Sequence, residues 1–147
     1  LCGLKNAILT PHIGGSTEEA QEAIAEDVVS KLIKFVNNGS TTGSVNVPQV
    51  ELPEQGTRAA EDEEAAKGKD ARGSRHHRIL HFHRNVPGVL SKMHALIADL
   101  GVNINAEYLQ TNRDVGYVVL DVDPTHGKRV LEGLRSIPET IRVRMLW

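Results

Sequence analysis

The chain has 147 residues, 39% of them hydrophobic, which is room for one ordinary domain or for a small domain with an appendage. Its formal net charge of -2 gives no positive field that favours nucleic acid, and no apolar run approaches the roughly 18 residues that cross a bilayer. The single cysteine, Cys2, excludes an internal disulfide framework, and no signal peptide is visible. We therefore expect a soluble, cytoplasmic protein that binds neither nucleic acid nor membrane.

The first forty residues predict a strand, a loop and a long helix. Residues 7–9 are an apolar run typical of a short buried strand. Ser16 with Glu19 three residues later has the pattern of a capping box, which predicts a helix that starts there and runs to about Asn37. Gly39 then supplies the left-handed conformation that commonly ends a helix.

One face of this predicted helix is apolar and unusually wide. Its central stripe consists of Ala20, Ile24, Val28, Leu32 and Phe35. Nothing in the first half of the chain offers this face a partner, so we expect it to pack against another subunit or against a part of the protein outside this sequence. The chain begins with Leu1 and not with Met, and we interpret it as the C-terminal piece of a longer protein.

Two segments connect this helix to the second half of the chain. Residues 44–51 hold valines around Pro48, which predicts an extended segment and not a central strand. Residues 53–77 are rich in charge and alanine and contain almost no large apolar side chains, so that little in them favours burial. We therefore predict a flexible charged linker over residues 53–77.

The second half predicts the element order β-α-β-β-α-β. Residues 79–83 alternate with the two-residue period of a strand, Asn85 and Pro87 provide a helix cap and first turn, and Gly101 ends that helix. The remaining elements are strands over 103–110 and 115–122 joined by a turn at 112–114, a helix from Asp123 to Pro138, and a strand from 141 to the end. This order predicts an α+β, ferredoxin-like domain over 78–147, with both helices on one face of an antiparallel sheet.

Two stretches of the sequence together resemble one enzyme family. TPHIGGSTEEAQ, residues 10–21, is similar to the end of the catalytic region of D-2-hydroxyacid dehydrogenases. HFHRNVPGVLSKMHALIADLGVNINAEYLQT, residues 81–111, resembles the ACT regulatory domain of the phosphoglycerate dehydrogenases in that family. The resemblance implies the end of a catalytic region over 1–52, a linker over 53–77 and an ACT domain over 78–147.

The first stretch implies part of an active site. Enzymes of this family use NAD to oxidise the 2-hydroxyl of 3-phosphoglycerate in serine biosynthesis, and His12 matches the imidazole that takes the hydroxyl proton. His12, Ile13, Gly14 and Gly15 match the loop beside the nicotinamide, where glycines let the backbone approach the cofactor. The other catalytic partners and the dinucleotide motif G-x-G-x-x-G are absent from this sequence, so we do not expect the fragment alone to be active.

The second stretch implies an effector site. In members of the family L-serine binds between two ACT domains, and the matching positions are His83 and Asn85 of one copy and Asn103 of the other. Primary amides carry both a donor and an acceptor, so they can bind the ammonium and carboxylate groups of an amino acid. The resemblance therefore implies a homo-oligomer that associates through its ACT domains.

Other interpretations of these residues stay open. One is a non-catalytic amino-acid-binding or dimerisation module with a vestigial dehydrogenase-like start. Asn85 alone fits a helix cap, and Asn103 alone fits the position after a glycine stop. His81 and His83 share one face of a strand, a spacing that can bind a metal, but no cysteine or acidic ligand accompanies them. We therefore predict no metal site.

Overall fold

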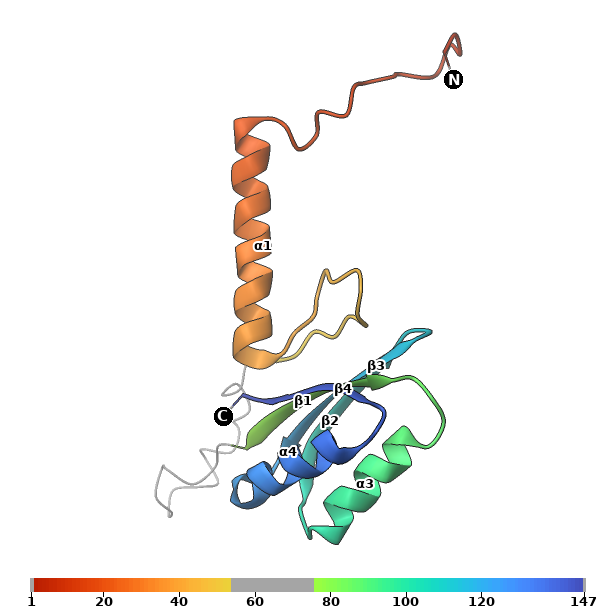
Figure 1. The fold of residues 1–147 in the computed structure, drawn as a ribbon. Coiled ribbons are helices and arrows are strands. Elements are labelled where there is room, and N and C mark those ends of the chain that lie inside the picture. Colours follow the sequence, from red (N-terminus) through yellow and green to blue (C-terminus); the bar gives the residue numbers. More distant parts are fainter. Residues whose placement is uncertain (1, 54–75, 147) are drawn as a thin grey trace.

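The computed structural model describes residues 2–53 and 76–146, so nearly all of the predicted linker at 53–77 lies outside the described residues (Figure 1). Its helices and strands are α1 (Glu18–Asn38), β1 (His77–Arg84), α3 (Val89–Asp99), β2 (Ile104–Thr111), β3 (Val115–Val122), the 3-10 helix η1 (Pro124–His126), α4 (Gly127–Ser136) and β4 (Thr140–Met145). The first strand thus begins one residue before the predicted start of the domain at 78.

The four strands form one antiparallel sheet in the order β2-β3-β1-β4. Helices α3 and α4 lie together on one face of this sheet (Figure 1). The chain order β-α-β-β-α-β with this arrangement of strands is the ferredoxin-like fold. The α+β class predicted from the sequence is therefore confirmed.

The main hydrophobic core lies between the sheet and these two helices. Its buried members are Ile79, Val89, Met93, Ile97, Val102, Val118, Leu120, Val122, Val130, Leu134, Ile137 and Val143. On the strands these are alternate residues, and on the helices they recur every three or four residues. Burial of each such side chain contributes about 1.5–3 kcal/mol, so this layer is what holds the domain together.

Helix α3 begins later than the sequence predicts. Its first residue is Val89, and the residue before it is Gly88, whose positive φ of 91° a glycine adopts at little cost. Pro87 lies in the turn ahead of the helix and not in its first turn. The prediction that Asn85 caps this helix is therefore wrong.

The end of α3 follows the prediction. Gly101 has a positive φ of 66°, and its N–H donates to the carbonyl of Ala98 over 2.9 Å. The N–H of Val102 donates to the carbonyl of Ile97 over 3.1 Å, which completes the paired hydrogen bonds of a Schellman motif. This confirmed glycine stop places Asn103 immediately before β2.

The N-terminal segment differs from the prediction at two places. Residues 7–9 form no strand, and Ile8 and Leu9 are 92% and 55% exposed. A strand needs a neighbour for its backbone groups, and no strand among the described residues pairs with this segment. Helix α1 is capped by Thr17, whose hydroxyl accepts from the N–H of Ala20 over 3.2 Å, and not by Ser16.

The last turn of α1 packs on the face of the sheet opposite to α3 and α4 (Figure 1). The helix ends, as predicted, at Gly39, which has a positive φ of 86°. The hydroxyl of Tyr117 donates to the carbonyl of Gly39 over 2.6 Å, and burial raises the pKa of Tyr117 above its usual range. A second core on this face consists of Val50, Leu52, Leu80, Tyr117 and Val119.

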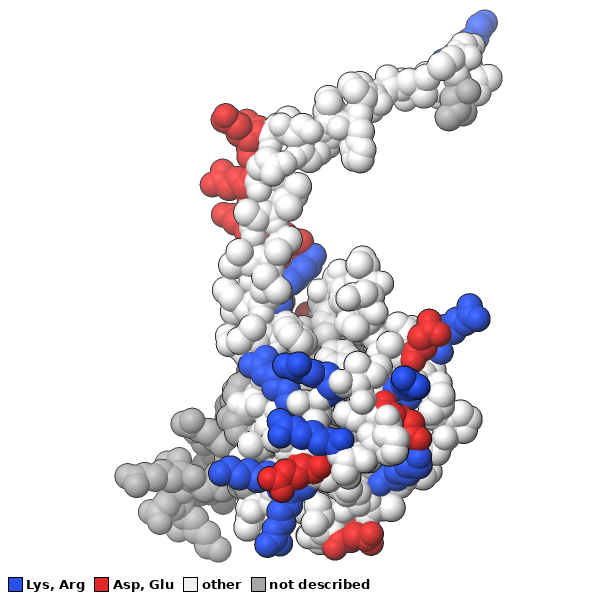
Figure 2. Space-filling view, viewed as in Figure 1, with Lys and Arg blue, Asp and Glu red and all other residues white. Residues whose placement is uncertain are grey.

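The rest of α1 extends away from the sheet (Figure 1). Its apolar stripe is half-exposed, since Ile24, Val28 and Leu32 keep 48%, 47% and 56% of their surface accessible. Figure 2 shows few charged side chains here apart from acidic ones toward the start of the helix. Packing of this face against another subunit or another part of the protein stays a prediction. Among the described residues, no helix has the length and apolarity to cross a membrane.

Candidate functional site

The two halves of the predicted effector site lie at opposite ends of the sheet. Asn85 follows β1 and lies beside the turn between β2 and β3. Asn103 precedes β2, whose first residue, Ile104, pairs with Val122 at the end of β3, and Val122 pairs in turn with His77 at the start of β1. Because an eight-residue strand rises about 25 Å, one chain cannot bring both amides to the same small ligand.

His83 is buried, with 2% of its surface exposed, on the same face of β1 as His81. Its Nδ1 lies 2.8 Å from the carbonyl oxygen of Arg84, and its ring covers Gly116 on β3, where any larger side chain would collide with the ring. The Nε2 atom of His83 is buried without a hydrogen-bond partner among the described residues. A buried polar atom left unpaired costs free energy, so this nitrogen would gain from contact with a ligand.

Asn85 is exposed and tied to the β2–β3 turn. Its Nδ2 donates to the carbonyl of Asn112 over 2.7 Å, and its backbone N–H donates to the carbonyl of Asp114 over 2.9 Å. These bonds leave the Oδ1 atom and one side-chain N–H of Asn85 available to another molecule.

Asn103 is also exposed, at the other end of the sheet. Its Nδ2 donates to Oδ1 of Asn105 over 3.1 Å, and within the described residues its own Oδ1 accepts no hydrogen bond. The structure therefore places His83 and Asn85 at one end of the domain and leaves Asn103 at the other.

His81 is fully buried beside His83, with ring centroids 5.4 Å apart. Its ring nitrogens lie 3.1 Å from Sδ of Met93 and 2.8 Å from Oγ1 of Thr140. Burial, and to a smaller extent the neighbouring His83, lower the pKa of His81 to about 4. In the part of the chain that the structure describes, no three potential ligands are grouped for a metal ion.

This lowered pKa predicts a loss of stability in mild acid. An unperturbed imidazole titrates near pH 6.5, so between about pH 6.5 and pH 4 the unfolded chain binds a proton at His81 that the folded chain excludes. We expect the free energy of unfolding to fall by roughly 2–3 kcal/mol as the pH decreases through this window. Urea titrations of the wild-type chain and of His81→Gln across the window measure the effect. An equal pH dependence in both proteins would contradict the prediction.

Residues 10–16 form an exposed loop ahead of α1. The N–H of Ser16 donates to the carbonyl of Ile13 over 2.9 Å, which closes a tight turn over Gly14 and Gly15. A side chain added at Gly14 would meet no atom within 4 Å, so the loop presents bare backbone to its surroundings. His12 is exposed on this loop, and no described residue forms a hydrogen bond with its ring.

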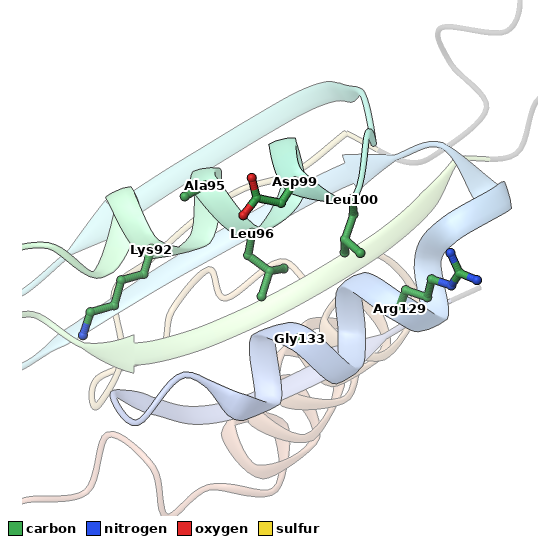
Figure 3. A pocket seen from close by; sticks show the side chains of 7 residues that line it. All are labelled: Lys92, Ala95, Leu96, Asp99, Leu100, Arg129 and Gly133. Atoms are coloured by element: carbon green, nitrogen blue, oxygen red, sulfur yellow. The ribbon is translucent and has the colours of Figure 1, made fainter.

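An open groove of about 480 Å³ lies between α3 and α4 (Figure 3). It is lined by Lys92, Ala95, Leu96, Asp99, Leu100, Arg129 and Gly133. Leu96 points toward α4, where Gly133 leaves room for it, so the two helices approach closely at this point. None of the predicted site residues lines this groove, and it is therefore distinct from the predicted effector site.

Comparison with known proteins accounts for the whole length of the chain. A family model described as an AHAS small subunit-like ACT domain matches residues 79–142. All of the chain is 44% identical to D-3-phosphoglycerate dehydrogenase of Escherichia coli strain K12, and 97% of it is 44% identical to the protein of that name from Haemophilus influenzae and 38% identical to that from Dictyostelium discoideum. The matched residues make up most of the sheet domain, which is ACT-like. The chain as a whole matches the C-terminal part of D-3-phosphoglycerate dehydrogenases, and it spans 32%, 30% and 30% of the length of these three relatives.

Two residues of the sheet domain beside the predicted site were missed by sequence reasoning. Gly116 leaves room for the ring of His83, and Asn105 holds the side chain of Asn103. Both residues are unusual in a strand. A glycine inside a strand often marks a place where another group lies close to the backbone, and asparagine is depleted from strands. Neither signal says which distant residue is contacted, and that requires the register of the sheet.

Proposed function

We propose that this chain is the C-terminal part of an NAD-dependent D-3-phosphoglycerate dehydrogenase, a cytoplasmic enzyme whose ACT domain binds L-serine and regulates the oxidation of 3-phosphoglycerate to 3-phosphohydroxypyruvate. The observation that carries the proposal is the similarity over the whole chain. The N-terminal loop, helix α1 and the ACT domain align in one order with enzymes of this name.

In the complete enzyme, we assign the loop at residues 12–15 to one border of the nicotinamide site. The bare backbone at Gly14 fits the close approach of a flat ring, and NAD supplies the hydride acceptor. His12 takes the proton of the substrate hydroxyl, a role that imidazole fills more often than any other side chain. The sequence of this chain contains no G-x-G-x-x-G motif, so the rest of the dinucleotide site lies outside it.

The proposed effector site is shared by two copies of the ACT domain. One copy contributes Asn85, with its free Oδ1, together with the unpaired Nε2 of His83, and the other contributes the free Oδ1 of Asn103. The ammonium of serine needs acceptors, and its carboxylate and hydroxyl need donors. Because the ligand contacts both copies, it binds tightly in only one arrangement of the subunits, and this differential affinity is what regulation at a distance requires.

Calorimetric titration of the chain with L-serine is expected to show binding that is about tenfold or more weaker in Asn85→Ala and in Asn103→Ala. Each change removes a hydrogen bond to a charged group of the ligand, and such bonds contribute about 1.5–3 kcal/mol. Asn46→Ala, which removes an exposed amide from the segment after α1, is the matched control and should bind like the wild type. Unaltered binding by both site variants would refute the proposed site.

A mixture of the two variants tests whether the site is shared. In a mixed dimer of Asn85→Ala and Asn103→Ala chains, one site loses both amides and the other keeps both. Mixing the two weak variants should therefore restore serine binding at one site in each mixed dimer. If both amides acted within one chain, the mixture would bind no better than either variant alone.

A further inference from the structure

Asn103 belongs to a short chain of hydrogen bonds that also contains Asn105 and His76. Nδ2 of Asn103 donates to Oδ1 of Asn105 over 3.1 Å, and Nδ2 of Asn105 lies 2.9 Å from Nδ1 of His76. An amide nitrogen can only donate, so Nδ1 of His76 is the acceptor and carries no proton. The lone pair on Nδ1 of His76 therefore sets the orientation of both side-chain amides. Asn105 turns its oxygen toward Asn103, and Asn103 keeps its own oxygen free.

The backbone of β2 is irregular at the middle member of this chain. The register of β2 with β3 shifts between Ile104 and Ala106, so Asn105 has no partner residue on β3. The shift reverses the alternation of side chains: Ile104 packs against the helix-side core, whereas Tyr108, four residues later, packs against the opposite core. A bulge of this kind re-aims one side chain while the strand continues, and here that side chain is Asn105.

We propose that Asn105 and His76 are positioning residues, which hold Asn103 with its carbonyl oxygen toward the ammonium group of the amino-acid effector. This inference rests on the proposed effector site. It adds to that site which atom of the Asn103 amide, the oxygen or the nitrogen, faces the ligand. An ammonium group has only donors, so it is bound by the oxygen of an amide and not by its nitrogen.

Calorimetric titration of the full chain with L-serine tests the inference. Asn105→Ala removes the acceptor for Asn103 and should weaken serine binding about three- to tenfold, the effect of one lost hydrogen bond. Asn105→Asp keeps an acceptor for Asn103, so this variant should bind within about twofold of wild type.

Gln110→Ala removes another exposed amide from β2 and is the control, with wild-type binding expected. Wild-type affinity in Asn105→Ala, or an Asn105→Asp variant as weak as Asn105→Ala, would overturn the inference. In either case Asn103→Ala would still bind weakly, so the proposed effector site would stand. A wild-type chain that does not bind L-serine would overturn the inference and the effector site together.

Discussion

Replacing His12 with alanine in the complete enzyme is expected to lower kcat about 100-fold or more, while the KM for 3-phosphoglycerate changes little. A general base acts on the proton only as the transition state forms, so its loss affects turnover and not ground-state binding. The substitution should leave the fold intact, because the side chain is exposed and forms no hydrogen bond with any described residue. Steady-state kinetics with saturating NAD measure both constants.

His94→Ala is the matched control for this experiment. His94 is also an exposed histidine, but it lies on α3, where its Nε2 is 3.0 Å from a carboxylate oxygen of Glu107. Its removal should leave kcat unchanged. A variant with wild-type turnover would rule out the assigned role of His12.

The sheet domain was predictable because its local patterns and its packing agree. Residues 79–83 alternate as a strand with one face in the core does. Val89, Met93 and Ile97 have the helical spacing of a buried helix face. Gly101 could be recognised as a helix stop because the two hydrogen bonds of this stop, from the N–H groups of Gly101 and Val102, are formed within a few residues. Patterns of this kind require no knowledge of the distant parts of the chain.

The predictions that failed depend on partners distant in the sequence or outside it. Asn85 is a residue type that is common at helix caps, but its side chain instead donates a hydrogen bond to the carbonyl of Asn112, in a turn 27 residues away. Residues 7–9 have the apolar composition of a buried strand but no neighbouring strand among the described residues. The positions of His83, Asn85 and Asn103 at the two ends of the domain followed from element order, whereas the contact of Asn105 with His76 depends on a bulge that no local pattern indicates.

Arg78→Ala is expected to destabilise the folded chain by about 3–5 kcal/mol, the cost of removing one partner of a buried ion pair. Arg78 is 2% exposed on β1 and lies directly opposite Asp121 on β3. Its Nε and Nη2 donate to the two carboxylate oxygens of Asp121, each over 2.7 Å. Its Nη1 donates to the backbone carbonyls of Asn38 and Pro53 over 3.2 and 3.3 Å. One guanidinium thus joins the sheet to the end of α1, and its loss removes all four of these hydrogen bonds.

Two comparisons separate this effect from the removal of any ion pair. Lys31→Ala breaks a pair of similar length, 2.6 Å to Asp27, but both side chains are about half-exposed, so the loss should be below about 1 kcal/mol. The double variant Arg78→Met with Asp121→Leu removes both buried charges and should be more stable than Arg78→Ala, because no carboxylate is then left in the core without its guanidinium. Chemical denaturation of the four chains gives each free energy of unfolding. If Arg78→Ala cost no more than Lys31→Ala, the guanidinium would not be the link between α1 and the sheet.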